Sequence, residues 1–331
     1  MIGRGWNADG WASAWREEEL LFGCGLTDFA GSGVVHMTGG VAAFWACFFL
    51  GERRDKFPEL PGYAFVFQCL GTLILWFGWF GFNGVSTLYI VGYGQVAAKV
   101  MVCTTLSAAA GAVANLYLNA LWDKYGAQTD VHLTVRLGNA TNGVLSGLVG
   151  ITAACSVVEP YAALIIGAGS APVYMVTSKV LAQVPCFGAD GHFGTGTIDD
   201  VIDAIPVHGF CGIYGVLMAG FFATPHNYGM AYYSARATEC AGVFYGGSGN
   251  MLAAQVVFIL ANLCWTSVCS IGVFGGLKFV GLLRVAVDVE NDGMDVSEHG
   301  ASSSSNFSLK EVEMPASGDA AVKAPRKGSA A

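Results

Sequence analysis

The chain has 331 residues, of which 54% are hydrophobic and only 12% charged, with a mean hydropathy of +0.53. Soluble domains carry about twice that share of charged residues, so the composition argues against a soluble protein and favours a membrane protein. The net charge of −8 is accompanied by no cluster of lysine and arginine, which argues against a nucleic-acid partner.

Residues 1–27 are predicted to form a loop outside the membrane. They lack the continuous apolar core of a signal peptide, and their aromatic rings suit a membrane–water interface. These rings belong to Trp6, Trp11, Trp15 and Phe22. Because the chain starts outside with no span before it, we expect an N-terminally truncated protein or a partial sequence.

Seven long runs almost free of charged residues follow this loop, and about 20 apolar residues suffice to cross a bilayer. The predicted spans cover residues 29–51, 62–83, 97–121, 140–157, 161–182, 205–223 and 252–278. Lysine and arginine favour the loops on the C-terminal side, which predicts a cytoplasmic C-terminus. The expected fold class is therefore an all-α polytopic membrane protein in a lipid bilayer.

Ionisable residues lie within or beside two of these spans, where they are costly and often line a substrate path. Asp28 is at the outer mouth of the first span, with His36 two turns deeper. His208 follows Asp203 by five residues. Because a neutral imidazole both donates and accepts, two facing histidines can form a polar line through an apolar channel. The alternative is that each histidine is a buried structural residue.

The stretch WFGWFGFNGVST, residues 76–87, places five aromatic rings before Asn83, Ser86 and Thr87. Ring faces attract cations, and a hydroxyl can replace one water molecule around a hydrated cation. The pattern indicates a recruitment site for a small cation or, alternatively, an interfacial aromatic belt.

Two further patterns are interpreted as structural. Gly143 and Gly147 form a small-residue face that predicts close helix packing. The ten cysteines are scattered without a C-x-x-C pair, so no zinc or redox motif is indicated and we expect small apolar side chains.

Together these stretches resemble the ammonium transporter family, in its plant and microbial branch. The motifs, in chain order, are DFAGSGVVHMTGGVAAFWACFFLGER, GWFGFN, NGVLSGLVGITAACSVVEP, VHGFCGIYG and DGMDVSEHG. The resemblance covers roughly residues 6–300. It implies the helical bundle of that family without its first four spans. It also implies a homotrimer with one pore per subunit, placed in the plasma membrane, and no cofactor.

The resemblance also implies roles for single residues. Twin histidines and aromatic rings would line the pore, namely His36, His208, Trp79 and Phe82. The recruitment site would use the Ser86 hydroxyl, with Asp28 as a structural brace and a tryptophan from Trp11 or Trp15. The resemblance further implies that the segment DGMDVSEHG contacts the neighbouring subunit. Ser297 lies in it, and a phosphate there would add negative charge beside Asp295 and Glu298, which makes Ser297 a candidate regulatory site; the alternative is a plain solvent-exposed serine.

The expected function is uptake of ammonium, recruited as NH4+ and conducted as NH3 with or without its proton. The alternative is an ammonium sensor or a non-conducting regulatory subunit with the same fold. An enzyme is not expected, since no nucleophile–base pairing or metal-ligand spacing is present. The expected division is an outer loop at 1–27, a transmembrane domain at 28–283, a regulatory segment at 284–300 and a disordered tail at 301–331.

Overall fold

The computed structural model describes residues 6–7, 9–54, 63–126 and 137–300. The chain divides into two compact units, residues 1–281 and residues 282–331. This division lies two residues before the end of the predicted transmembrane domain. The predicted disordered tail, 301–331, lies outside the described residues.

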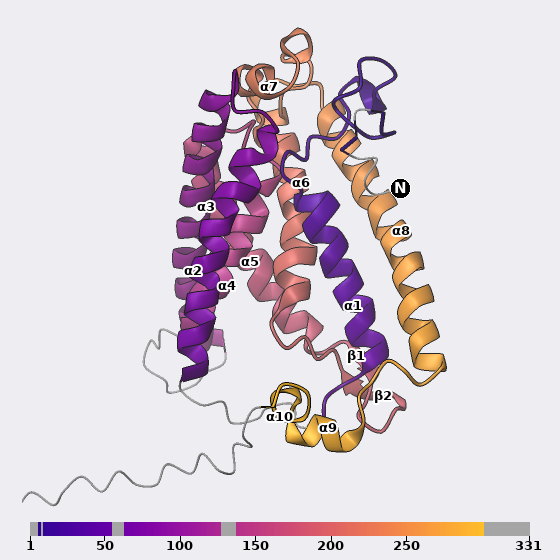
Figure 1. Cartoon of the computed structure of the whole chain (residues 1–331). Coiled ribbons are helices and arrows are strands. Elements are labelled where there is room, and N and C mark those ends of the chain that lie inside the picture. Colours follow the sequence, from indigo (N-terminus) through magenta and orange to yellow (C-terminus); the bar gives the residue numbers. More distant parts are fainter. Residues whose placement is uncertain (1–5, 8, 55–62, 127–136, 301–331) are drawn as a thin grey trace, which may run out of the picture. The chain divides into compact units, whose positions relative to one another are not determined.

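The described part of the first unit is built mainly from helices (Figure 1). Its α-helices are α1 Thr38–Leu50, α2 Tyr63–Gly84, α3 Gly94–Leu121, α4 Leu137–Thr152, α5 Pro160–Leu181, α6 Cys211–Phe222, α7 Pro225–Ala231 and α8 Asn250–Phe279. Two π-helical turns, Ser32–Met37 and Ile205–Phe210, lead directly into α1 and α6. A small antiparallel hairpin, β1 Pro185–Phe187 with β2 Phe193–Thr197, follows α5.

Six helices of the described residues are long and apolar enough to cross a membrane. They are Ser32–Leu50, Ala64–Thr87, Gly94–Tyr125, Pro160–Leu181, Ile205–Phe222 and Asn250–Phe279. Each lies within a few residues of a predicted span, because an apolar run long enough to cross the membrane can be recognised in the sequence without tertiary information. The predicted fold class, a polytopic helical membrane protein, is confirmed.

The predicted span at 140–157 has a different form. Helix α4 ends at Thr152 after 16 residues, and 153–157 continue as a turn rather than as helix. The carbonyls of Thr152 and Ala153 accept hydrogen bonds from the backbone of Ala30 and Phe29. Non-helical backbone is tolerated at membrane depth only where protein surrounds it, and this turn is fully buried.

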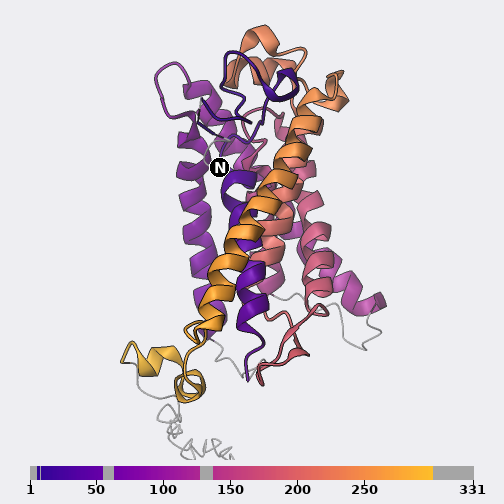
Figure 2. The ribbon, with the colours of Figure 1, turned by 90° about the vertical axis from the view of Figure 1, so that its right-hand side faces the viewer.

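Helices α3, α4 and α5 pack closely, with α2 beside them, while α6 lies between this group and α1 (Figure 1). A Cβ atom on Gly143 would lie 2.6 Å from the carbonyl oxygen of Gly111, and one on Gly147 would lie 2.3 Å from that of Ser107. The predicted packing role of these two glycines is confirmed. Helix α8 runs across α1 on the other side (Figure 2).

An ion pair ties α1 to the segment before α6. Arg53, three residues beyond α1, donates from Nε to Asp199 Oδ2 at 2.7 Å and from Nη2 to Asp199 Oδ1 at 2.9 Å. Paired guanidinium–carboxylate bonds fix orientation as well as distance. The two segments that carry His36 and His208 are therefore joined at this end of the unit.

The opposite end carries a disulfide that the sequence did not predict. Cys24, in the loop before the first π-helical turn, is bonded to Cys240, in the connection between α7 and α8. The two residues are 216 positions apart. The expectation of small apolar cysteines is wrong for this pair, because nothing local in the sequence marks partners so distant.

The described part of the second unit contains α9 Val287–Asp292 and α10 Met294–Ser297. Arg284 forms a two-bond ion pair with Glu290, at 2.9 and 2.7 Å. Ser297 is exposed, and its hydroxyl donates to the carbonyl oxygen of Gly293 at 3.1 Å.

Candidate functional site: a paired histidine column below an aromatic pocket

His36 and His208 face each other inside the first unit. Their Nδ1 atoms are 3.2 Å apart, and the rings are nearly parallel, with centroids separated by 5.2 Å. At that distance one Nδ1 donates and the other accepts. The Nε2 atom of His36 is buried and has no hydrogen-bond partner among the described residues.

Each histidine sits in a π-helical turn, a widened helical geometry that is rare and frequent at functional sites. In the first turn, the amide of His36 donates to the carbonyl of Gly31, five residues back, at 3.1 Å. Gly31 has φ of +105°, a conformation that favours glycine. Asn262 of α8 donates to the carbonyl of Gly33 at 3.0 Å and so holds the turn from behind.

The two histidine-bearing segments touch through glycines. A Cβ atom on Gly40, one turn after His36, would lie 2.1 Å from the backbone nitrogen of Gly209. On the other segment, a Cβ atom on Gly212 would lie 2.6 Å from the carbonyl oxygen of Ser32. The backbones therefore cross at a distance that only glycine permits, and this crossing brings the two imidazoles together.

Aromatic rings from α2 extend the histidine pair on one side. We call His208, His36 and these rings, Trp79 and Phe82, the column. Trp79 stacks on His36 with centroids 5.1 Å apart and an interplanar angle of 11°. Phe82 contacts both rings, with centroids 5.5 Å from His36 and 5.7 Å from Trp79. The indole nitrogen of Trp79 donates to the hydroxyl of Thr152 at 3.0 Å, which fixes its ring.

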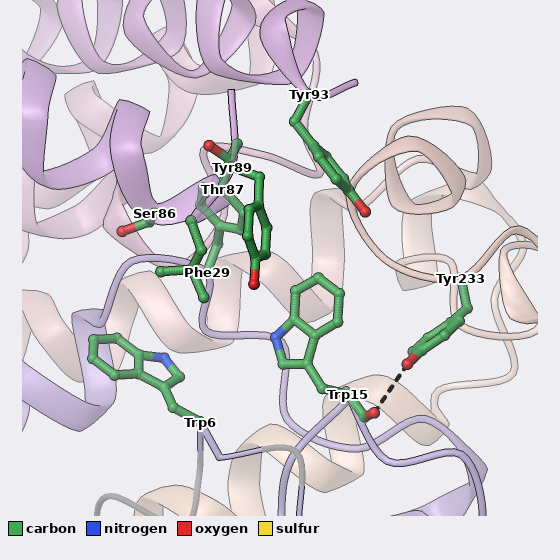
Figure 3. Close-up of a pocket in the computed structure, with 9 residues that line it drawn as sticks. Trp6, Trp15, Phe29, Ser86, Thr87, Tyr89, Tyr93 and Tyr233 are labelled. Carbon is green, nitrogen blue, oxygen red and sulfur yellow. Dashed lines mark hydrogen bonds between the residues drawn. The ribbon is translucent and has the colours of Figure 1, made fainter. Parts of the chain in front are cut away.

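An open pocket of about 400 Å³ lies at the end of the unit where the N-terminal loop folds back. It is lined by Trp6, Trp15, Phe29, Ser86, Thr87, Leu88, Tyr89, Tyr93 and Tyr233. Figure 3 shows Trp6 and Trp15 reaching into it from the N-terminal loop. Most of the lining is aromatic, an environment whose ring faces attract cations.

Asp28 braces this region without lining the pocket. It is almost fully buried, and its Oδ2 accepts hydrogen bonds from the amides of Gly33 at 3.0 Å and Val34 at 2.8 Å. Its carbonyl oxygen accepts the indole N–H of Trp6 at 2.6 Å. Burial raises the pKa of the Asp28 carboxyl to about 6, against the lowering effect of the backbone N–H donors.

The other predicted site residues are distributed as follows. Ser86 lines the pocket, and its hydroxyl donates to the carbonyl of Phe82 at 2.7 Å. Both candidate tryptophans pack against the core, and of the two Trp15 also lines the pocket. Asp203 does not pair with His208. Its carboxylate instead accepts hydrogen bonds from Asn142, Tyr174 and Ser178.

Several pocket residues were not singled out from the sequence. Trp6 is an interfacial ring by its sequence pattern, and the one signal that links it to the pocket is its place in the same aromatic loop as Trp15. Tyr233 comes from the connection after α7 and Phe29 from the residue after Asp28. No sequence pattern joins residues that are some 200 positions apart.

Known proteins match this chain over most of its length. Residues 4–304 match the model of the Ammonium Transporter Family. Among curated relatives, Ammonium transporter 1 member 1 of Oryza sativa subsp. japonica is 38% identical over 313 residues. Putative ammonium transporter 1 member 5 of Arabidopsis thaliana is 37% identical over 310 residues. Each alignment covers 89% of this chain and 58% of the relative, so the chain spans little more than half their length.

Solved structures agree with the fold. A structure named Sensor Amt Protein has a TM-score of 0.67 and 27% identity, and the match covers 88% of this chain and 65% of that one. Saccharomyces cerevisiae Mep2 has a TM-score of 0.65 and 24% identity, covering 85% and 58%, and shows the likeness of fold. The family match over residues 4–304 and the six apolar helices of the described residues lead to one conclusion: this multi-pass membrane protein belongs to the ammonium transporter family.

Proposed function

We propose that the chain supplies the conduction path of an ammonium transporter. NH4+ is recruited in the aromatic pocket, with Ser86 and the tryptophans as its contacts. It then passes as NH3 along Phe82, Trp79 and the pair His36 and His208, with or without its proton following. The single observation that carries this proposal is the histidine pair, with His36 buried and His208 partly buried, joined at 3.2 Å and continued by the stacked ring of Trp79.

The chemistry of the pair suits ammonia. When one Nδ1 donates to the other, the two Nε2 atoms are left with opposite roles, one as donor and one as acceptor. NH3 has both N–H donors and a lone pair, so it can bond to each in turn. A full positive charge in an apolar path is costly, which favours loss of the proton before the column.

The pocket suits the charged form. Aromatic faces attract NH4+. The Ser86 O–H donates a hydrogen bond to the carbonyl oxygen of Phe82, so its oxygen still has lone pairs that can accept an ammonium N–H. Trp15 is the tryptophan of the two sequence candidates that lines this pocket, and we add Trp6 to it. Asp28 acts indirectly, by capping the first π-helical turn and holding Trp6.

The wider assembly follows from the same family. We propose a homotrimer in the plasma membrane with a cytoplasmic C-terminal unit that contains Ser297. The disulfide Cys24–Cys240 supports this orientation, because disulfides persist on the oxidising, extracellular side. The sensor alternative is not favoured, since the curated relatives reported above are named transporters.

A growth and uptake assay tests the proposal. The chain is expressed in yeast that lacks its own ammonium transporters, alone and preceded by the additional N-terminal part of the rice relative. We expect growth on limiting ammonium in the extended form and uptake of labelled methylammonium. His36→Ala should lower that uptake about tenfold, the equivalent of one lost hydrogen bond of about 1.4 kcal/mol.

His226→Ala is the matched control, because His226 is an exposed histidine on α7, away from the column. It should transport like the wild type. Unchanged uptake and unchanged discrimination against potassium in His36→Ala would reject the conduction role of the pair.

A further inference from the structure

The wall of the aromatic pocket is held by a second loop that follows α7. Three consecutive carbonyl oxygens of the N-terminal loop, those of Ala14, Trp15 and Arg16, accept hydrogen bonds from this loop. Tyr233 donates to Trp15 at 3.0 Å, as Figure 3 shows. Arg236 donates from Nη1 to Arg16 at 3.1 Å and from Nη2 to Ala14 at 3.3 Å.

Arg236 is itself held in place for this task. It is partly buried, and its guanidinium carbon lies 4.4 Å from the centre of the Tyr233 ring. A guanidinium presents its donors in a rigid plane, so one side chain can bond two carbonyls that flank a residue. A lysine ammonium is a single point charge and cannot bridge them in the same geometry.

A second attachment lies further along the same loop. Cys24 is linked to Cys240, four residues after Arg236. The N-terminal loop is therefore fixed to one partner segment at residues 14–16 and again at residue 24. Between these attachments, the side chains of 17–19 are exposed.

Trp15 is the central residue of the first attachment, residues 14–16. Its indole packs on Tyr232, with ring centroids 4.6 Å apart, and it lines the pocket. We propose that Arg236 is a positioning residue of the pocket: by bonding the carbonyls on both sides of Trp15, it holds the indole in the pocket wall. That the pocket binds ammonium rests on the proposed function. That Arg236 positions Trp15 rests only on the contacts described above.

An effect of the Arg236 charge and an effect of Arg236 on the position of Trp15 predict opposite changes in cation binding when Arg236 is removed. Removing a positive charge near a cation site, by itself, strengthens cation binding, because repulsion is lost. Releasing Trp15 weakens binding, because the ring must be ordered again each time the ligand binds. Arg16→Ala is the matched control: it removes an equal charge from the N-terminal loop, together with the Arg16–Glu19 contact at 3.3 Å, and keeps the carbonyl of residue 16 that Arg236 bonds.

The experiment uses the purified chain in lipid nanodiscs. The emission of Trp15 is isolated as the difference between each protein and its Trp15→Phe counterpart. Without ligand, Arg236→Ala should roughly double the acrylamide quenching constant of Trp15, with Arg236→Lys in between and Arg16→Ala unchanged. Methylammonium titration should give a Kd about tenfold higher than the wild-type value for Arg236→Ala, and a Kd equal to or lower than the wild-type value for Arg16→Ala.

The outcomes separate the two claims. Unchanged quenching in Arg236→Ala, or the same change in Arg16→Ala, overturns the positioning role. Altered quenching with no methylammonium response in the wild type upholds the position of Trp15 and overturns the pocket as an ammonium site. If Arg236→Ala fails to fold, Tyr233→Phe provides a second test, because it removes one hydroxyl only. It should raise the quenching constant of Trp15 by a smaller factor, and unchanged quenching in this variant also contradicts the proposal that this loop holds Trp15 in place.

Discussion

Asp28 shows how a charged side chain is accommodated beside the membrane. One carboxylate oxygen receives two backbone N–H groups at the start of the first π-helical turn, while the other, Oδ1, has no hydrogen-bond partner among the described residues. Helix starts leave N–H groups unsatisfied, and an acceptor there is worth about 1 kcal/mol. The residue therefore stabilises the segment that carries His36.

Two substitutions of Asp28 should differ in effect. Asp28→Asn keeps one oxygen acceptor and should fold, whereas Asp28→Ala loses the cap and should lower stability by about 1–2 kcal/mol. Melting temperatures in detergent measure both. Equal melting temperatures for the two variants would contradict the capping role.

The pH dependence of Asp28 provides a second test of its burial. The pKa of this carboxyl is about 6 in the folded protein, above its ordinary value of 3.8. The folded state thus holds the proton more tightly, so this contribution to stability is full below about pH 4 and is lost as pH rises through 6. Wild type should gain melting temperature over Asp28→Asn between pH 7 and pH 5. A constant difference would contradict the raised pKa.

At the scale of elements, the contact of the two histidines depends on the crossing of two helices. Gly40 and Gly209 allow the backbones of α1 and the second π-helical turn to meet, and Arg53 with Asp199 ties the same segments further along. Folded interiors resist even one added methyl group where backbone is the neighbour. The crossing therefore fixes the separation of the imidazoles.

Neighbouring glycines provide a matched pair of variants. Gly40→Ala would place a methyl group 2.1 Å from the Gly209 nitrogen and should destabilise by about 2 kcal/mol while reducing uptake. Gly39→Ala meets nothing within 4 Å and should behave like the wild type. Thermal unfolding and methylammonium uptake measure the two effects. Equal behaviour of the variants would show that the crossing does not set the site.

At the scale of the whole molecule, regulation through the C-terminal unit is a proposal that begins at Ser297. This residue ends α10 and is followed by Glu298, and phosphate at a helix C-terminus beside an acidic residue is repelled. In the proposed trimer, such repulsion would release the segment from the neighbouring subunit.

Ser297→Asp should therefore reduce uptake by about fivefold, the usual scale of coupling between sites. The neutral variant Ser297→Asn should not. The particle mass of both variants should remain three times the 34.5 kDa of the chain. Light scattering and uptake measured together decide the matter, and normal uptake in Ser297→Asp would remove Ser297 from the mechanism.

Sequence and structure contributed differently at each scale. Uncharged runs predicted six of the observed helices, and the glycine spacing at 143 and 147 predicted a packing face. The residues 153–157 could not be predicted as a buried turn, because distant backbone amides bond two of its carbonyls, with Phe29 bonding Ala153 and Thr224 bonding Val157. Composition shows whether a segment is apolar enough for the membrane. It does not show which distant residues will form hydrogen bonds with the backbone groups of that segment.

By itself, the sequence determined that this protein is a helical membrane protein, which family it resembles, and which histidines and aromatic rings are candidates for a substrate path. Those conclusions depend on local runs and motifs. Only the tertiary structure decided that the two imidazoles meet, that Trp6 joins Trp15 in one pocket, and that Arg236 and Cys240 hold the N-terminal loop. Such contacts join residues distant in the chain, and their partners are selected by packing geometry, which no local pattern encodes.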